Sequence, residues 1–277
     1  MPKIHIICNN TASAGKTAEH GLALLFEYRG HTFLFDGGNG STFKANLPPD
    51  FLPKIEFAIL SHGHWDHGTG LAELPGELKI YFVPGAEVPR FSFHDSDKAF
   101  HRISLPNETI RRLAISGEKV SSFCELLPGV RLTGPIPRTS GEDCGGKFFL
   151  DDTGKAADPI ADEQSLLFDC GILVTGCGHA GIINTLEFCR RQTGCRIHTI
   201  SGGLHLLNAS RDRLRRTAEV FNSQGIQNLI LLHCTGNDAV NELKTLLPDC
   251  RICTPDAGES IIFNGNNFTI ESTPDRR

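Results

Sequence analysis

Short runs of apolar residues recur along the chain and predict buried β-strands. Turn-forming segments such as RGH and DGGNG separate several of them. The runs are KIHIIC, LALLFEY, HTFLFD, FAILS, KIYFV, QSLLFD, ILVTG, IHTIS and NLILLHC. In the opening third of the chain they follow one another closely, which predicts successive strands joined by turns.

The last third of the chain shows a second periodicity. Three segments mix apolar and polar residues at helical spacing, and they predict helices over residues 182–192, 210–224 and 239–247. These segments alternate with the strand-like runs. Strands that alternate with helices are typical of the α/β class, to which we assign the chain.

Two stretches show no clear period. Residues 84–112 mix Pro, Phe, His and charged residues, and residues 134–162 are rich in Gly, Pro and Asp. We expect both to be long loops on a single domain that spans residues 1–277, and not linkers between domains. Long loops in a compact domain are often functional, so both stretches are candidates for covering a site.

Composition narrows the choice of partner. The 277 residues carry a net charge of −5, which argues against a general nucleic-acid binder. The apolar runs are too short to cross a membrane, and the opening MPKIHIICNN has no apolar signal core. We therefore expect a cytoplasmic protein with a small-molecule substrate, and we expect neither nucleic acid nor a membrane as its partner. The sequence does not specify an oligomeric state.

The ten cysteines are scattered and do not form a spaced framework. In a protein without an export signal we expect them to be reduced thiols. The single C-x-x-C, from Cys250 to Cys253, has no partner pair, so it is half of a zinc site at most and is interpreted as incidental.

The stretch SHGHWDHGTGL, residues 61–71, concentrates candidate metal ligands directly after the apolar run FAIL. His62 and His64 are two residues apart and can converge on one metal ion from an extended turn. Asp66 and His67 follow and can point to a second ion. Imidazole nitrogens with a carboxylate oxygen suit zinc, iron or manganese.

This stretch resembles the metal-binding signature of the metallo-β-lactamase fold superfamily. Further segments narrow the resemblance, in the order EHGL, FDGGNG, TGPIPR, DEQSLLF, TGCGHAGIIN, SGGLHLLN and LLHCTG. Together they are similar to the branch typified by 7,8-dihydropterin-6-methyl-4-(β-D-ribofuranosyl)-aminobenzene 5′-phosphate synthase and its bacterial relatives. The resemblance implies a four-layer αββα sandwich, with two sheets face to face, helices outside and metals at one rim.

Three more histidines follow predicted strands, at the carboxyl ends where sites in α/β proteins gather. They are His179 after ILVT, His205 after IHTIS and His233 at the end of NLILL. We predict two divalent metal ions, with zinc expected and iron or manganese as alternatives. The predicted ligands are His62, His64 and His179 for one ion, and Asp66, His67 and His233 for the other. We expect the remaining strand-associated histidines, His5, His31 and His198, to be structural.

The chain departs from many superfamily members in the second half of the ligand set. It has no histidine between His101 and His179, where many relatives place a ligand. Cys177 stands where many relatives place a bridging aspartate, so its thiolate is a candidate bridge between the metals. The alternative is a small buried residue, the usual role of a free cysteine. We expect Cys234 to be structural.

The resemblance implies hydrolytic or transfer chemistry on a small phosphorylated or heterocyclic substrate. Asp66 is expected to orient the nucleophile as well as to bind metal, and His205 is a candidate general acid or substrate contact. The typifying enzyme joins an aminobenzene ribofuranosyl phosphate to a pterin that carries a pyrophosphate leaving group, so pterin-like substrates are included. Candidate substrate contacts are His20, Arg90, Arg102 and Arg138.

The leading function has two versions, and three other functions stay open at this point. Hydrolase and transferase share the same metal motif, and the fold also accommodates a di-iron redox or oxygen-handling centre. A phosphodiesterase or nuclease is a further possibility, which the acidic balance disfavours. A non-catalytic metal or ligand sensor is disfavoured by the intact ligand run and by the lack of an apparent DNA-binding helix pair.

Overall fold

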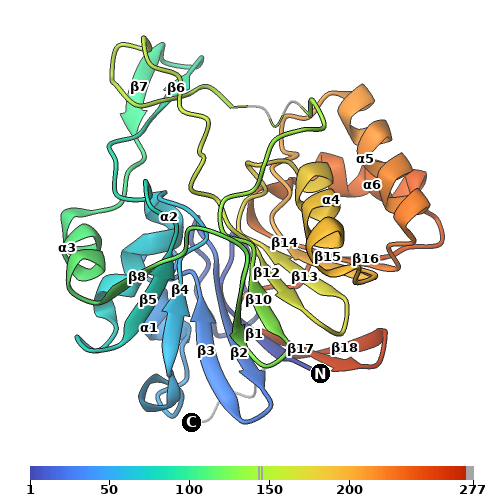
Figure 1. The fold of residues 1–277 in the computed structure, drawn as a ribbon, viewed down its shortest axis with the longest axis horizontal. Helices are drawn as coiled ribbons and strands as arrows, with labels where there is room; N and C mark the ends of the chain where they lie inside the picture. Colours follow the sequence, from blue (N-terminus) through green and yellow to red (C-terminus); the bar gives the residue numbers. More distant parts are fainter. Residues whose placement is uncertain (143, 145, 273–277) are drawn as a thin grey trace.

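The computed structural model describes residues 1–142, 144 and 146–272. Two β-sheets pack face to face and helices cover their outer faces, which confirms the predicted αββα sandwich (Figure 1). Each of the nine predicted strand runs contains a strand, and each of the three predicted helices is present. Among the described residues, no helix has the length and apolar character needed to cross a membrane.

The first sheet has eight strands. In spatial order they are β18 (Asn267–Ser272), β17 (Glu259–Asn264), β1 (Lys3–Cys8), β2 (Ala23–Tyr28), β3 (His31–Phe35), β4 (Phe57–Ile59), β5 (Lys79–Phe82) and β8 (Gly117–Lys119). β2 and β3 pair antiparallel through the two-residue turn Arg29–Gly30, where both residues have positive φ, 50° and 87°. Such a turn matches the twist of the paired strands.

The second sheet has seven strands, of which the last four along the chain are parallel. In spatial order they are β16 (Arg251–Cys253), β15 (Asn228–Leu231), β14 (Thr199–Gly202), β13 (Ile172–Thr175), β12 (Leu166–Phe168), β10 (Val130–Leu132) and β9 (Cys124–Leu127). The helices are α1 (Phe43–Asn46), α2 (Trp65–Gly68), α3 (Asn107–Ser116), α4 (Ile182–Thr193), α5 (Arg211–Gln224) and α6 (Asn237–Leu246).

Three apolar clusters fill the spaces between the four layers. Phe26 and Phe168 face each other between the sheets, with ring centroids 5.6 Å apart. Phe221 of α5 belongs to a second cluster with Leu229 of β15, outside the second sheet. Leu113 of α3 belongs to the third, outside the first sheet. β13 to β15 are buried on both faces, and β13 (ILVT) and β15 (NLIL) are accordingly almost entirely apolar.

Residues 84–112 are not the long loop that we expected. They contain β6 (Phe91–His94), β7 (Ala99–Arg102) and the first turns of α3. Apolar and polar residues alternate in FSFH, and the polar turn DSDK separates it from AFHR. The irregular flanking sequence obscured this weak hairpin pattern. Residues 134–162 are largely irregular where described, apart from β11 (Phe148–Phe149); Asp143 and Gly145 lie outside the described residues.

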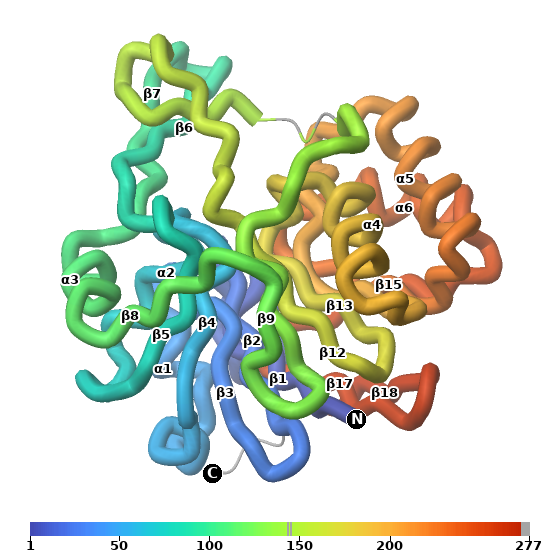
Figure 2. The backbone as a smooth tube through the Cα atoms, in the orientation of Figure 1, coloured from blue at the N-terminus to red at the C-terminus, as the bar shows by residue number. Residues whose placement is uncertain are grey.

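β11, β6 and β7 form a third, small sheet, which we call the hairpin module (residues 91–102 and 148–149). Figure 1 and the tube in Figure 2 show that it projects from one end of the sandwich, at the rim where the loops after β4 and β13 lie. The module therefore stands over one edge of both sheets.

Arg90 lies at the base of this module and is not free to contact a substrate, contrary to expectation. Its side chain is buried between two carboxylates, with Nε 3.0 Å from Asp158 Oδ2 and Nη1 3.0 Å from Asp162 Oδ2. Asp162 also accepts a hydrogen bond from the Gly63 backbone N–H at 2.8 Å. The ion pair thus links the module to the loop that carries the histidine motif.

Replacing Arg90 with Ala is expected to lower the free energy of unfolding by about 3–5 kcal/mol, because two buried carboxylates would lose their charged partner. Urea denaturation of both proteins measures the change. The exposed pair Arg111–Glu108, 2.9 Å apart, provides the control, and Arg111→Ala should change stability by no more than about 0.5 kcal/mol. Equal effects of the two substitutions would contradict a stabilising role for Arg90.

Candidate metal centre

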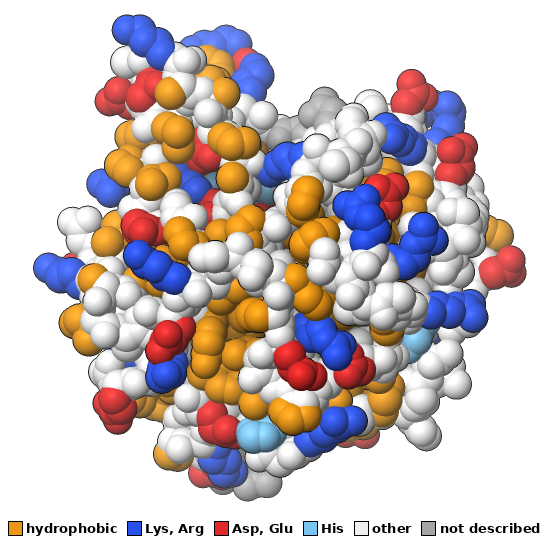
Figure 3. Space-filling model, viewed as in Figure 1, with side chains coloured by type: hydrophobic (Ala, Val, Ile, Leu, Met, Phe, Trp, Pro, Cys, Tyr) orange, Lys and Arg blue, Asp and Glu red, His pale blue; other side chains and the backbone are white. Residues whose placement is uncertain are grey.

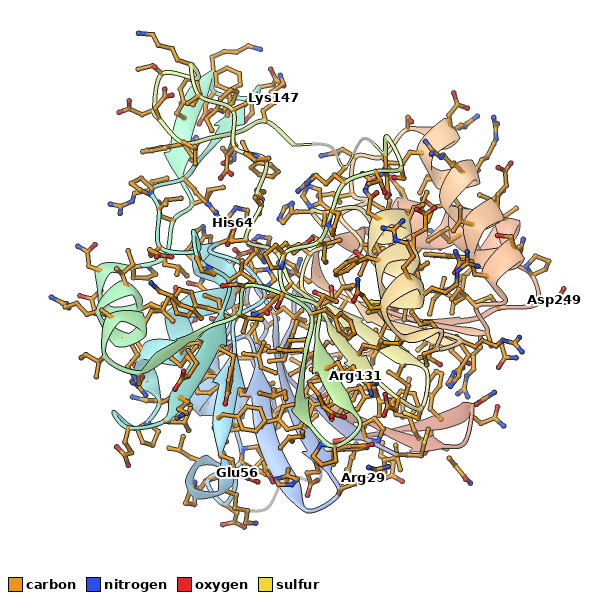
Figure 4. All side chains as sticks on the ribbon, in the orientation of Figure 1. Arg29, Glu56, His64, Arg131, Lys147 and Asp249 are labelled. Atoms are coloured by element: carbon orange, nitrogen blue, oxygen red, sulfur yellow. The ribbon has the colours of Figure 1, made fainter. Side chains whose placement is uncertain are left out.

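The loops that follow three strands meet at one rim of the sandwich, beneath the hairpin module. β4 leads to His62 and His64, β13 to Cys177 and His179, and β15 to His233. Figure 4 labels His64 at this rim, between the sheets and the module, where Lys147 is labelled. Residues far apart in the sequence are therefore brought to a single place by the topology of the sheets.

The first predicted ligand group is compact. His62 Nε2 and His64 Nδ1 lie 3.0 Å apart, and the His179 ring centroid is 4.8 Å from that of His62 and 5.0 Å from that of His64. Two nitrogens bound to one tetrahedral zinc ion stand about 3.3 Å apart, so the spacing fits. The Nε2 atom of His179 is buried without a hydrogen-bond partner, which is the condition that a metal ion would relieve.

The second predicted group converges on the carboxylate of Asp66. Its Oδ2 lies 3.2 Å from His233 Nε2 and 3.9 Å from His67 Nε2. His20 Nε2 also lies 3.2 Å from the same oxygen, so His20 reaches the ligand group directly although we expected it only near the site. One ligand atom each from His20, Asp66 and His233 falls within a span of 4.8 Å.

Cys177 lies between the two groups. Its Sγ is within 4.8 Å of ligand atoms of His62 and His179 on one side, and of His67 and His233 on the other. The shortest of these contacts is 3.1 Å, to His67 Nε2. Burial raises the pKa of this thiol well above its usual value, so a cation beside it would be needed to hold the thiolate.

Burial also prepares the histidines for metal binding. It lowers the pKa of His62 and His179 well below the usual range and that of His64 to about 3, with neighbouring imidazoles adding to the effect at His62 and His179. These side chains are therefore neutral near pH 7 and keep a lone pair available. Neutral imidazole is the form that binds metals.

Asp36 orients His67 and the start of the loop that carries the histidine motif, and sequence reasoning assigned it no role. The residue is fully buried at the end of β3, with φ of 61°. It accepts hydrogen bonds from the Ser61 backbone N–H at 2.7 Å and from His67 Nδ1 at 2.6 Å. That bond leaves His67 Nε2 facing Cys177. Burial alone would lower the pKa of His67, but the charges of Asp36 and Asp66 raise it to about 9. Asp36 is the aspartate of the FDGGNG segment, so this segment contained the sequence signal for the residue.

We expect Asp36→Asn to weaken metal binding about 10–100-fold, because partners of this kind orient the ligand and increase its basicity. Competition with a chromophoric chelator measures the change. Asp249→Asn, at an exposed aspartate far from the rim (labelled in Figure 4), is the control and should bind metal as the wild type does. Unchanged metal affinity in Asp36→Asn would show that Asp36 does not support metal binding.

Glu163 is a second buried residue that the sequence did not single out, although it lies in the DEQSLLF segment. Its carboxylate accepts hydrogen bonds from the backbone N–H groups of His179, at 2.7 Å, and Ala180. Burial raises its pKa to about 7, in spite of these two bonds. Glu163 thus fixes the turn that presents His179.

A cavity of about 1000 Å³ opens above the candidate ligands. The space-filling view shows a hollow between the projecting module and the helical side of the molecule (Figure 3). Phe148 of the module lies over the ligands, with its ring centroid 5.6 Å from His64, 5.2 Å from His179 and 5.7 Å from His205. His20 and Arg102 line this cavity as well.

Arg138 is not among the residues that line the cavity, so its role as a substrate contact stays a prediction. Its guanidinium donates hydrogen bonds to the backbone carbonyl oxygens of Pro159 and Ile160. The structure thus gives it the task of holding two parts of the irregular stretch together. A sequence does not reveal such a backbone partner.

The histidines that we expected to be structural lie away from the rim and bond to other groups. His5 Nδ1 lies 2.8 Å from Ser260 Oγ, and His198 Nδ1 lies 2.8 Å from Thr199 Oγ1. His31 Nδ1 lies 2.8 Å from a carboxylate oxygen of Glu56. Cys234 donates a hydrogen bond to the Cys177 carbonyl at 3.3 Å, and its Sγ is also grouped with His205 and Cys177.

The αββα sandwich with a histidine-rich rim defines a class of protein. The sequence profile of the metallo-beta-lactamase superfamily matches residues 17–150, and the structure has the metallo-beta-lactamase fold. This likeness supports a metal-dependent, hydrolase-like function.

Three relatives place the chain more closely. The uncharacterized protein MJ0448 of Methanocaldococcus jannaschii is 29% identical over 249 residues, covering 88% of this chain and 94% of the relative. The 7,8-dihydropterin-6-methyl-4-(beta-D-ribofuranosyl)-aminobenzene-5'-phosphate synthase of the same organism is 26% identical over 248 residues, covering 81% and 83%. The crystal structure of Tm1679, a metal-dependent hydrolase of the beta-lactamase superfamily, matches with a TM-score of 0.80 and 27% identity, covering 94% of this chain and 98% of that one.

Proposed function

We propose that the protein is a metal-dependent hydrolase or transferase that acts on a small phosphorylated or heterocyclic, pterin-like substrate. The observation that carries the proposal is the position of Cys177, shared by two histidine groups at the base of a cavity of about 1000 Å³. Two divalent ions held there, with zinc expected, would supply Lewis-acid polarisation and an activated nucleophile.

The residues around the candidate centre would have distinct tasks. Asp66 Oδ2 lies among His20, His67 and His233, so it can bind metal and orient an attacking group. His205 has a buried Nδ1 without a hydrogen-bond partner and lines the cavity, as a general acid or a substrate contact requires. The hydrogen bond to Asp66 raises the pKa of His20, which favours a protonated imidazole facing anionic substrate groups.

The cavity wall favours a flat substrate that carries negative charge. Phe148 and Trp65 offer aromatic surface, and Arg102 and Lys147 offer cations. An aromatic ring can stack on a heterocycle, and guanidinium groups bind phosphate in bidentate fashion. The pterin and phosphate in the name of the methanogen synthase are in keeping with this lining, although that enzyme is only 26% identical.

Purified protein tested with phosphodiesters, lactones and pterin pyrophosphates, with and without an aromatic amine acceptor, tests the proposal. Product release without the acceptor indicates a hydrolase, and release that depends on the acceptor indicates a transferase. Turnover should disappear on chelation and return with added Zn²⁺. Metal-independent turnover, or none with any of the three substrate classes, would contradict the proposal, and a visible di-iron spectrum would favour the redox alternative.

A further inference from the structure

The hairpin module carries a second group of candidate ligands, separate from the rim. One ligand atom each from His94, Asp97 and His101 lies within 4.8 Å of the others. All three side chains are exposed, and none belongs to the groups around Cys177. No residue of this cluster has a part in the chemistry proposed above.

The pairing of the two strands creates the cluster. β6 and β7 are antiparallel, with Ser92 opposite His101 and His94 opposite Ala99. His94 and His101 are therefore diagonal neighbours on one face of the hairpin, and their rings stack with centroids 4.2 Å apart and planes 28° apart. Asp97, in the turn, reaches back to within 2.7 Å of His101 Nε2.

Nearby charges leave Asp97 available to the histidines. Asp95, in the same turn, is engaged by Lys98 at 3.2 Å and by Lys147 at 2.6 Å. Within the part of the chain that the structure describes, Asp97 has no lysine partner; it accepts hydrogen bonds from His101 and from the Ala99 backbone N–H.

The scaffold under the cluster is rigid. The opposite face of the hairpin is aromatic, with the Phe93 and Phe100 rings 5.0 Å apart and Phe149 5.4 Å from Phe100. β11 adds a third strand, which pairs Phe148 with Ser92. Ligands on paired strands are positioned more reproducibly than ligands on an unsupported loop.

We propose that the hairpin module binds one divalent transition-metal ion through His94, Asp97 and His101, separately from the centre at the rim. Two imidazoles and a carboxylate suit zinc, nickel or copper and not magnesium or calcium. His94 and His101 also line the large cavity. An ion held there would stand at the mouth of the cavity, with its remaining positions open to water or to an anionic group.

Nickel binding tests the site in the intact protein. Wild-type protein loaded with two equivalents of zinc, enough to fill only the centre at the rim, should take up one more equivalent of Ni²⁺ in a calorimetric titration, and His94→Ala/His101→Ala should lose that equivalent. His101→Gln, a milder change, should weaken uptake in the same direction. Asp95→Asn, which alters the neighbouring carboxylate, should keep it. Because the replaced side chains are exposed, the melting temperature should stay unchanged.

The nickel binding expected at the hairpin module does not depend on the proposed metal centre at the rim. His64→Ala, which disturbs the proposed centre at the rim, should still bind the additional nickel ion at the hairpin. Equal Ni²⁺ uptake by the wild type and His94→Ala/His101→Ala would overturn the proposal. So would a loss in Asp95→Asn as large as that in the double variant, because the binding would then reflect general acidic charge and not this set of ligands.

Discussion

The His64→Ala variant is expected to lose metal and most of its turnover. The His64 ring contributes to the tightest nitrogen spacing in the centre, 3.0 Å from His62 Nε2, and its removal leaves the first group with two imidazoles. Metal ions typically supply several kcal/mol of transition-state stabilisation, so the loss of about 4 kcal/mol corresponds to roughly a 10³-fold fall in kcat/KM. Elemental analysis and kinetics on the substrate identified by the assays above measure the two effects.

His31→Ala is the matched control, because it removes a partly exposed histidine that pairs with Glu56 away from the rim. It should retain the full metal content and activity. If His64→Ala also kept both, His64 would not be a ligand, and the interpretation of the rim as a catalytic metal centre would have to be abandoned.

The sequence predicted those features of the site that depend on local order along the chain. The histidines of the SHGHWDHG stretch follow a buried strand, and His179 and His233 likewise follow apolar runs. Because parallel strands end at the same edge of a sheet, their positions in sequence translate directly into proximity. The αββα sandwich itself required the resemblance as well as the strand pattern.

Features that depend on partners distant in sequence could not be predicted. Asp36 acts on His67 from the neighbouring strand, and no local pattern states that the two will be 2.6 Å apart. Arg90 and Arg138 both lie in irregular stretches of the sequence, and nothing local distinguishes them. In the structure Arg90 is enclosed by carboxylates, whereas Arg138 donates hydrogen bonds to backbone carbonyls. The β6–β7 hairpin is different, since the alternation in FSFH and the polar turn DSDK were present and were missed because proline and charged residues surround them.

At Cys177 this chain departs most clearly from the ligand set that the superfamily resemblance implies. Replacing Cys177 should separate the two ligand groups. We expect Cys177→Ala to retain about half of the bound metal and to lose roughly 100-fold or more in turnover, because a bridging ligand serves both ions of a two-metal site. Cys177→Asp should recover metal content, since a carboxylate oxygen can replace the thiolate as a ligand.

A spectroscopic measurement distinguishes a bridging thiolate from a buried thiol that only packs. In Co²⁺-substituted protein, a sulfur ligand gives a near-ultraviolet charge-transfer band, which should be present in the wild type and absent from both Cys177 variants. Cys124→Ala, at an exposed cysteine, should keep the band. A band that persists in Cys177→Ala would assign the sulfur ligand to Cys234, whose Sγ lies in the same cluster with His205. No band in the wild type would mean that Cys177 remains protonated, as its burial alone favours.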